Sequence, residues 1–477
     1  MTSKTPICVD LDGSLIKTDL LNEAALALLK LNPLYIFSIF VWLLQGRANL
    51  KHQIASRVSI NAASLPYNQE LCDYLKEESD TGCEIVLVTA SNKRYAESIG
   101  NHLGFISNVI ASDANQNLKG KEKARVLTET YGEGNFIYVG DSYADLQVWK
   151  QSKAAVVVNV SGRRRKQLKK MDIEEIKHFA SDNNYFHSIF QAARPYQWVK
   201  NILIFVPLVM SHQIGSGSLV LQSILGFFAM SFVASSVYVL NDLGDLEADR
   251  LHPDKKTRPF AAGDLPISTG IILIIILLSA GLSVAAMLPS LFLYILEIYF
   301  ITNIFYTMLF KRIVILDIII LSLLYTIRIL AGGAAINEEI GFWLLAFSMF
   351  IFLSLSMQKR YAELKGIQER GLENAEGRAY QATDENLILA FGAMSGLISV
   401  LVLALYINST VVIELYNQPQ ILWLTCPIML YWISRMWLLT NRGIVSDDPI
   451  RFAVGDRTSY IVGGLMLSVI LIATIGI

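Results

Sequence analysis

Residues 241–250 read NDLGDLEADR and directly follow an apolar run that ends at Leu240. On a helix, Asp242, Asp245 and Asp249 stand at positions i, i+3 and i+7, which places them on one face. Three carboxylates on one face repel each other unless a cation lies between them. Two divalent cations bridging a diphosphate would neutralise the carboxylates and the leaving group together. This acidic motif therefore predicts a metal-dependent diphosphate site, and the alternative is an ordinary acidic helix end.

Apolar segments dominate the chain after Trp198. The sequence has 477 residues, 53% of them hydrophobic, and this length predicts more than one domain. Runs of roughly 18 or more apolar residues are long enough to cross a bilayer as helices. The sequence therefore predicts an all-α membrane domain. We expect it to lie in a bacterial inner membrane. Its nine apolar segments, the first of them short, are 199–212, 221–240, 267–287, 289–309, 314–333, 340–357, 386–408, 419–438 and 458–476.

The loops between these segments alternate in charge. One set, near 211–220, 288–290, 332–340 and 409–420, carries no Lys or Arg. Basic loops stay in the cytosol, so we expect a cytosolic N-terminus and an external C-terminus. The start of the chain shows no signal-peptide pattern, which agrees with this orientation. The basic set comprises Arg250, Lys255, Lys256, Arg258, Lys311, Arg312, Lys359, Arg360, Lys365, Arg370, Arg378, Arg442, Arg451 and Arg457.

Net charge and cysteine spacing narrow the classes of function. The formal net charge is −1, so we expect no nucleic-acid partner. The four cysteines, Cys8, Cys72, Cys83 and Cys426, have neither metal-ligand nor disulfide-like spacing. We expect them to be reduced thiols.

Three predicted strands in the N-terminal part each end in polar side chains. The carboxyl ends of neighbouring parallel strands meet at one edge of a sheet, where open α/β folds build their sites. Two carboxylates two residues apart can there supply a nucleophile and a general acid/base. The strands and the residues after them are 7–9 with Asp10-Leu11-Asp12-Gly13-Ser14, 85–88 with Thr89-Ala90-Ser91, and 136–139 with Gly140-Asp141 and the nearby Asp145.

In order along the chain, these stretches resemble the four motifs of the haloacid dehalogenase superfamily, most closely its phosphoserine-phosphatase-like members. The resemblance covers roughly residues 5–160 and implies a Rossmann-like α/β domain with a helical cap. It implies that Asp10 attacks phosphorus to form an aspartyl-phosphate. Asp12 would protonate the leaving group and then activate water. The implied Mg²⁺ ligands are Asp10, Asp12, Asp141 and Asp145.

The resemblance also implies that Thr89 and a lysine hold the phosphate. Lys123 fits that lysine best because it follows Gly120 at the family's usual offset, and Lys119 and Lys121 are alternatives. The alternative for the whole domain is a degenerate binding domain without catalysis.

The helical cap of this family falls at about residues 15–80 here. This segment contains the apolar run Pro33 to Leu44, which is too short to span a bilayer. The sequence favours a buried cap helix. The alternative is a face that dips into the membrane and admits a lipid-linked substrate.

The predicted domains are an α/β domain at 1–161, a basic linker at 162–193 and a membrane transferase domain at 194–477. The linker carries Arg163-Arg164-Arg165-Lys166 and Lys169-Lys170 just before the first apolar segment. These residues predict either contact with anionic lipid headgroups or a solvated linker helix.

The acidic motif and the K-x-R-P sequence at 256–259 resemble the first signature of UbiA-type prenyltransferases, over about 190–477. The resemblance implies about nine helices around a cavity open to the membrane. Quinone-pathway members carry a second aspartate pair, but here the stretch from Lys311 has only Asp317, with Leu321 four residues later. This departure, with the stretches at 193–201, 359–364 and 448–457, looks like the decaprenyl-phosphate phosphoribosyltransferase branch of the family.

That branch joins phosphoribosyl pyrophosphate to a polyprenyl phosphate and releases diphosphate. Such a substrate needs cations in addition to Mg²⁺. Arg328 lies inside a predicted span, where an arginine is costly and marks either function or a structural pairing. The candidate substrate-binding residues are Asn241, Arg194, Lys200, Arg258, Lys311, Asp317, Tyr325, Arg328, Lys359 and Arg360.

Together, the two resemblances predict a membrane transferase fused to a Mg²⁺-dependent phosphatase. The lipid product would carry a ribose 5-phosphate, which the phosphatase could remove. Fusion raises the effective concentration of the phosphatase at that product. One alternative is a prenyltransferase that moves a polyprenyl chain from its diphosphate to an aromatic or other acceptor. A non-enzymatic scaffold or transporter with a degenerate N-terminal domain is the other.

Overall fold

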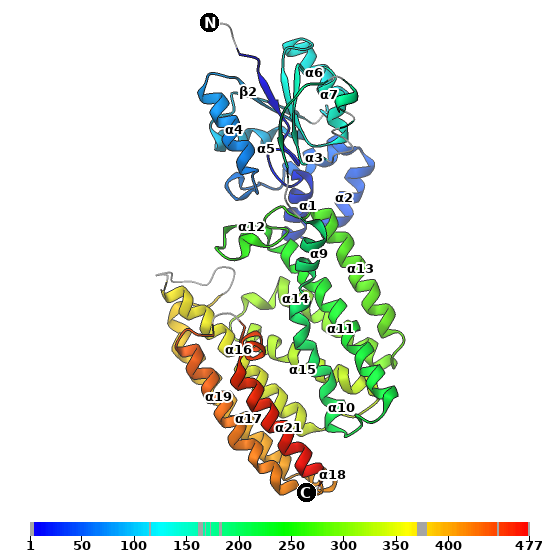
Figure 1. Ribbon diagram of the computed structural model, residues 1–477, viewed down its shortest axis with the longest axis vertical. Helices are drawn as coiled ribbons and strands as arrows, with labels where there is room; N and C mark the ends of the chain where they lie inside the picture. The colour runs from blue at the N-terminus through cyan, green and yellow to red at the C-terminus, as the bar shows by residue number, and fades with distance from the viewer. Residues whose placement is uncertain are drawn as a thin grey trace. The chain divides into compact units, whose positions relative to one another are not determined.

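The structure is a computed structural model (Figure 1). It describes residues 4–113, 116–160, 166, 168–171, 173–180, 184–369, 379–445 and 448–475, apart from the side chain of Val411. The chain divides into two compact units, Met1–Ala193 with Tyr238–Ile274, and Arg194–Val237 with Ile275–Ile477. Arg163, Arg164, Arg165, Arg370 and Arg378, which carry part of the predicted basic charge, lie outside the described residues.

A six-stranded parallel sheet forms the centre of the first unit, in the order β3-β2-β1-β4-β5-β6. The strands are almost continuous apolar runs because both faces of the sheet are covered. This doubly wound α/β arrangement confirms the predicted fold class. The strands are β1 (Ile7–Val9), β2 (Ile85–Asn92), β3 (Asn108–Ser112), β4 (Ile137–Gly140), β5 (Ala154–Val158) and β6 (Glu175–Phe179).

Helices cover both faces of the sheet (Figure 1). On one face, α4 (Gln69–Asp80) and α5 (Lys93–Leu103) pack with α1 (Leu20–Leu31) and α3 (Arg47–Ala55) over the inward residues of β1 and β2. On the other face lie α6 (Lys121–Tyr131) and α7 (Leu146–Trp149), which pack on the side chains that alternate with those. Successive strand residues point to opposite faces, so these short apolar strands supply two cores.

The sheet continues into the predicted linker. Residues of β6 pair with β5 in parallel, for example Val157 with His178. The segment from 162 to 193 therefore also holds the last strand of the sheet and α9 (Tyr185–Ala193). The basic residues at 163–170 indicated a linker, and the strand was not predicted. Strand β6 is half exposed and carries Glu175 and Lys177, as an edge strand does.

The apolar run in the cap forms α2 (Tyr35–Leu44), and the prediction that it is a buried helix is wrong. No residue of α2 is buried, although Tyr35, Ile39 and Trp42 pack partly against the core. The run reads YIFSIFVWLL, so its outward side is as apolar as its inward side. Apolar character alone could not tell a core helix from an exposed apolar one.

Eight described helices are long and apolar enough to cross a membrane, one fewer than the nine predicted segments. The chain is therefore a multi-pass membrane protein. Helices α11 and α15 are the most buried of the eight, and α13, α14 and α21 the least. The eight are α11 (Gly217–Gly244), α13 (Ile267–Ala285), α14 (Ser290–Met308), α15 (Leu316–Ile336), α16 (Phe342–Glu369), α17 (Glu385–Ile407) with the 3₁₀ turn before it, α19 (Thr425–Asn441) with the 3₁₀ segment before it, and α21 (Arg457–Ile475).

The first predicted span, 199–212, is not a long α-helix. It consists of the 3₁₀ segment η3 (Pro195–Phe205) and the short α10 (Val206–Met210). This segment runs against α15, where a Cβ on Gly332 would lie only 2.2 Å from the carbonyl oxygen of Ile204. Glycine is thus required at 332 because two backbones approach each other there.

Candidate active sites

The sheet topology brings the predicted α/β site together. Strand β1 lies between β2 and β4, with Val9 opposite both Leu87 and Val139. From β1 the sheet continues through β2 and β3 on one side and through β4, β5 and β6 on the other. The connections that leave β1 and β4 therefore run in opposite directions, and a crevice forms between them. Asp10 and Asp141 follow these two strands directly.

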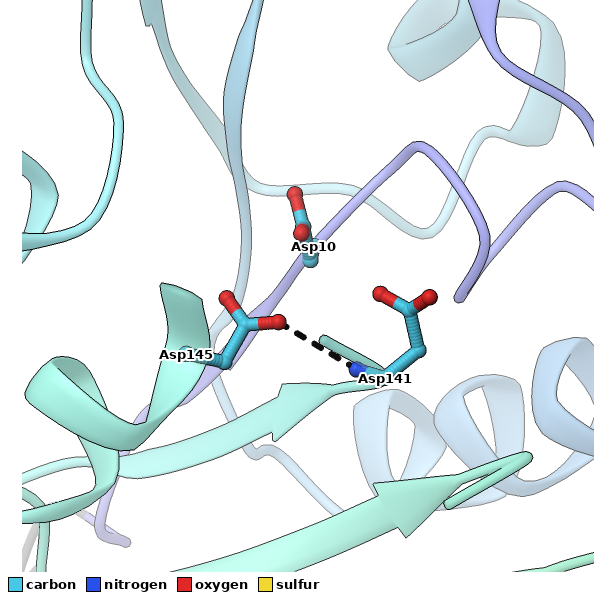
Figure 2. A group of neighbouring side chains, drawn as sticks. All are labelled: Asp10, Asp141 and Asp145. Carbon is cyan, nitrogen blue, oxygen red and sulfur yellow. Dashed lines mark hydrogen bonds between the residues drawn. The ribbon is translucent and has the colours of Figure 1, made fainter. Parts of the chain in front are cut away.

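Three carboxylates meet in this crevice. Asp10, Asp141 and Asp145 each offer an oxygen within 4.8 Å of the others. Figure 2 shows the three side chains pointing toward a shared space from separate segments. Gly13 makes room for them, because a Cβ there would lie 2.4 Å from Oδ2 of Asp141.

Lys123 supplies a buried positive charge to this cluster. Its Nζ lies 2.8 Å from Oδ1 of Asp10 and 4.0 Å from Oδ1 of Asp145. It also donates to the Tyr138 hydroxyl at 2.9 Å. Of the three candidate lysines, Lys123 is therefore the one that the structure places in the site. Lys121 is exposed on the same helix.

Asp145 is fixed by several donors. Its Oδ2 accepts from the amide and hydroxyl of Ser142, at 2.9 and 2.7 Å, and from the amide of Asp141 at 3.3 Å. The Tyr138 hydroxyl donates to its Oδ1 at 2.9 Å. Tyr138 was not among the predicted site residues, because within a strand it reads as an ordinary core aromatic.

The electrostatics of the cluster fit a divalent cation. Burial, with Asp145 and Asp12 nearby, raises the pKa of Asp10 to about 7 against the opposing effect of Lys123. Burial and the charges of Asp10 and Asp145 raise the pKa of Asp141 to about 8. A hard cation with oxygen ligands would offset this cost of placing carboxylates together, as Mg²⁺ does in such sites. Asp10, Asp141 and Asp145 are thus the residues that would hold it.

Asp12 is not in the group of described carboxylates that could hold a metal. Its Oδ1 accepts from the Leu20 amide at 2.8 Å, and its Oδ2 from the Ser91 hydroxyl at 2.6 Å. Thr89 donates to the same oxygen at 3.4 Å. Burial raises the pKa of Asp12, which suits a group that donates a proton. Ser91 is the last residue of the Thr89-Ala90-Ser91 stretch from which Thr89 was selected. It could therefore have been predicted as a site residue together with Thr89.

The acidic motif lies at a break between two helices. Helix α11 ends at Gly244, Asp245 is the N-cap of α12 (Leu246–Leu251), and its backbone is not helical. The three aspartates therefore do not lie on one continuous helix, and the prediction that they do is wrong. Asp242 and Asp249 nevertheless share a partner, since Nη1 of Arg258 lies 3.0 Å from one and 2.6 Å from the other. A cation between these two carboxylates is thus compatible with their geometry.

The residue after the motif's last aspartate contacts the cap. Arg250 donates to both oxygens of Glu23 in α1, at 3.2 and 2.5 Å, and to the Ala261 carbonyl at 3.1 Å. Glu23 also accepts from the Thr18 hydroxyl at 2.8 Å. Both charged side chains are less than a tenth exposed. All of these residues belong to the first unit, so the acidic motif and the cap of the α/β domain form one packed structure.

In the second unit, two predicted binding residues pair with each other. Arg360 donates to Asp317 Oδ2 at 2.6 Å, and neither side chain is exposed. The other oxygen of Asp317 accepts from the Tyr380 hydroxyl at 2.6 Å. Both oxygens of the only aspartate in the second signature are thus engaged within the protein.

A small pocket in the second unit collects other predicted residues. Tyr325, Lys359 and Asp448 line it, together with Ser356 and apolar side chains. Lys200 forms an ion pair with Asp448 at this position. The pocket therefore combines two lysines and a tyrosine with a carboxylate. Asp448 was noted in the sequence but not selected as a site residue.

Arg328 is held by structural partners. It donates to the Asn201 side chain at 2.8 Å, to the Tyr299 hydroxyl at 2.9 Å, and to the Leu324 carbonyl. Its guanidinium also lies 5.4 Å from the centre of the Tyr325 ring, which lines the pocket. Arg328 thus joins η3, α14 and α15 and lies next to a residue that lines the pocket.

Three other predicted residues lie in these same segments. Asn241 is in the last turn of α11, Arg194 is the N-cap of η3, and Lys311 is in the turn before α15. Arg194 adopts a left-handed conformation, with φ of 50°.

A bundle of apolar helices with an acidic motif, joined to a doubly wound domain with a carboxylate and lysine cluster, defines a membrane transferase with a fused hydrolase domain. The UbiA prenyltransferase family matches residues 202–454, more than half of the chain, and the haloacid dehalogenase-like hydrolase family matches residues 7–150. The chain belongs to the UbiA prenyltransferase family and carries an N-terminal haloacid dehalogenase-like domain, as predicted. Both families generally depend on Mg²⁺.

One relative matches nearly the whole chain, and others match only part of it. The chain is 32% identical to protein y4nM of Sinorhizobium fredii over 471 residues, 98% of this chain and 91% of that protein. It is 33% identical to nodulation protein NoeC of Azorhizobium caulinodans, over 60% of this chain and 93% of that protein. A decaprenyl-phosphate phosphoribosyltransferase of Corynebacterium glutamicum is 34% identical over 196 residues, 40% of this chain and 59% of that enzyme.

Proposed function

We propose that the membrane domain transfers a phosphoribosyl group from phosphoribosyl pyrophosphate to a polyprenyl phosphate, and that the fused domain then removes the ribose 5-phosphate. The observation that supports the first step is that Asp317 is hydrogen-bonded within the protein. Quinone-type members use a second aspartate pair for a diphosphate, but here the single aspartate is bonded to Arg360 and Tyr380. The relation to a decaprenyl-phosphate phosphoribosyltransferase supports the same substrate pair.

In the transfer step, the bond between the anomeric carbon and diphosphate breaks as a phosphate oxygen of the lipid forms a new bond to that carbon. Mg²⁺ held by Asp242, Asp245 and Asp249 would neutralise the departing diphosphate. Lys200 and Lys359 would bind phosphate groups of the substrates, and Tyr325 would orient them. Catalysis would then consist mainly of positioning and electrostatic stabilisation.

In the second step, Asp10 attacks the 5-phosphate and the phosphorus–oxygen bond to ribose breaks. Asp12 gives its proton to the departing ribose oxygen. Its carboxylate then takes a proton from the water that hydrolyses the aspartyl-phosphate. Thr89 and Lys123 would hold the phosphate, and Asp10, Asp141 and Asp145 would hold a Mg²⁺ ion that offsets its charge. The ion pair between Glu23 and Arg250 supports the sequence of steps, because it ties the cap to the acidic motif.

The purified chain in a bilayer should be offered phosphoribosyl pyrophosphate or a prenyl diphosphate in parallel, with polyprenyl phosphate as the acceptor in the first reaction. We expect a ribosylated lipid from phosphoribosyl pyrophosphate and no product from the prenyl diphosphate with an aromatic acceptor. Transfer of the prenyl chain to the aromatic acceptor would instead support the quinone-type alternative.

We also propose a cytosolic N-terminus and an external C-terminus in the bacterial inner membrane. The 11 residues of η3 and 5 of α10 extend at most about 30 Å at the rises of 3₁₀ and α-helices, which matches the hydrocarbon core. This segment would provide the ninth crossing. A reporter fused after Ile477 should therefore be accessible from outside. A cytosolic signal from it would mean that residues 195–210 do not cross.

A further inference from the structure

Helix α2 of the cap presents an apolar surface to its surroundings. Seven side chains on and just before the helix are about half to three-quarters exposed in the full chain. Phe37 is 70% exposed and Leu44 is 74% exposed. The helix contains no charged residue. The side chains of Tyr35, Ile39 and Trp42 are partly buried and already hold it against the core of the domain. The exposed set, the outer face of α2, comprises Leu34, Ile36, Phe37, Phe40, Val41, Leu43 and Leu44.

The stretch of the cap that contains α2, residues 24–69, has no acidic residue. No Asp or Glu occurs between Glu23 and Glu70, while the same segment carries four Lys and Arg residues and one histidine. Lys30 precedes α2 and Arg47 follows it, so a basic residue lies beyond each end of the outer face. Apolar side chains with flanking cations match the boundary between acyl chains and anionic headgroups.

We infer that the outer face of α2 inserts into the headgroup region of an anionic bilayer. The domain is held where it can do so. Leu26 of α1, five residues before that helix ends, packs against an apolar cluster of the same unit. This cluster includes Leu243 and Ile267, which lie at the ends of two candidate membrane spans. At ten residues, α2 is too short to span, so it lies in the interface.

A second copy of the chain fits this face less well. A two-fold interface sets the same patch against itself, which would bring two acid-free basic segments together. Like charges placed opposite each other across an interface are unfavourable. An anionic lipid surface provides the opposite charge and the apolar environment together.

Membrane insertion would also explain a pocket beside the phosphatase acid. Leu20, Leu21 and Ala24 of α1 and Lys51 and Ile54 of α3 line it, with Ser91. Ser91 is the residue that donates to Asp12. The two helices that line this mostly apolar pocket are the immediate neighbours of α2 in the chain, so α2 would hold their pocket at the bilayer surface.

Lipid quenching of a fluorophore on α2 tests this inference. The four native cysteines are buried, so a thiol-reactive, polarity-sensitive dye will label an introduced exposed cysteine selectively. The full chain carrying Phe40→Cys would be placed in nanodiscs of phosphatidylcholine and phosphatidylglycerol that contain nitroxide-labelled acyl chains. The matched control is Glu77→Cys, an exposed position on α4 (Figure 1). We expect several-fold stronger quenching of the dye at 40 than at 77.

A second variant separates insertion from mere proximity. Adding Phe37→Ser and Leu44→Ser to Phe40→Cys should reduce the quenching to the level of the control, with an unchanged circular dichroism spectrum because both side chains are exposed. Equal quenching at 40 and 77 would overturn the inference. A dye at 40 that is shielded from aqueous iodide but not quenched by lipid would overturn it as well, since a protein partner would then cover α2. Neither readout requires enzymatic activity, so the outcome does not depend on the proposed function.

Discussion

The two carboxylate clusters of this chain are assembled in opposite ways. In the haloacid dehalogenase-like domain, Asp10 and Asp141 follow different strands, and Lys123 reaches Asp10 from a helix. In the acidic motif, Asp242, Asp245 and Asp249 lie within one short stretch of chain, and Arg258 is nine residues beyond the last of them. The first cluster is fixed by tertiary structure, and the second by a local helix break and a loop.

This difference has consequences for charge. The side chain of Lys123 is only 4% exposed and belongs to the folded core, so its removal affects the fold as well as the site. Arg258 is 29% exposed and lies on a loop, so it can move aside when a metal and a diphosphate bind. We therefore expect the first site to be preformed and the second to depend on its cation.

The largest effect should follow changes within the acidic motif. Asp242→Asn, Asp245→Asn and Asp249→Asn should each reduce transfer roughly 10³-fold, because the charge that develops on diphosphate would lose its stabilisation. Glu247→Gln is the matched control, since this side chain lies in the same stretch but is exposed. Transfer rates at limiting Mg²⁺ would measure the effect. Any aspartate variant that keeps the full rate does not belong to the metal site.

Lys123→Met should destabilise the haloacid dehalogenase-like domain by about 3 kcal/mol, because the buried carboxylates would lose their partner. Lys121→Met, two residues away and exposed, should change stability by less than about 0.5 kcal/mol. Denaturant unfolding of this domain within the full chain gives both values. Equal stability of the two variants would show that Lys123 is not the counter-charge of the cluster.

The smallest effect should come from the contact between the cap and the acidic motif. Glu23→Gln would leave Arg250 with a weaker partner and should slow transfer by roughly ten-fold, as a residue that acts through its neighbours does. Glu70→Gln, exposed at the start of α4, is the control. A transfer rate that is unchanged in Glu23→Gln would mean that the ion pair only supports the packing of the first unit.

The sequence predicted the α/β site better than it predicted the membrane site. Asp10 and Asp141 directly follow parallel strands, and Thr89 lies in the carboxyl-terminal half of the neighbouring strand β2. These side chains must converge when the strands are parallel, so their spacing was informative. Tyr138 and Ser91 were missed because their roles depend on which side chains face each other. The membrane helices followed from the length of the apolar runs, and the α/β class followed from the strand ends and the family resemblance.

In the membrane domain, the residue types were informative but their partners were not. Arg360 and Asp317 were both selected as binding residues, yet they pair with each other across 43 positions of the sequence. Arg328 was correctly identified as unusual, and its partners Asn201 and Tyr299 come from other segments. Helical periodicity also placed the three aspartates on one face, although Gly244, a residue type that commonly ends helices, directly precedes the break at Asp245.

The lipid products of Asp10→Asn test the sequential action of the two domains most directly. The amide removes the nucleophile at nearly the same size and leaves the membrane domain unchanged. After incubation with phosphoribosyl pyrophosphate and polyprenyl phosphate, mass spectrometry should find the lipid-linked ribose still carrying its 5-phosphate in the variant. The wild type should give the same lipid without that phosphate. Identical lipids from the two proteins would contradict the proposal that the fused domain acts on the product of the transferase.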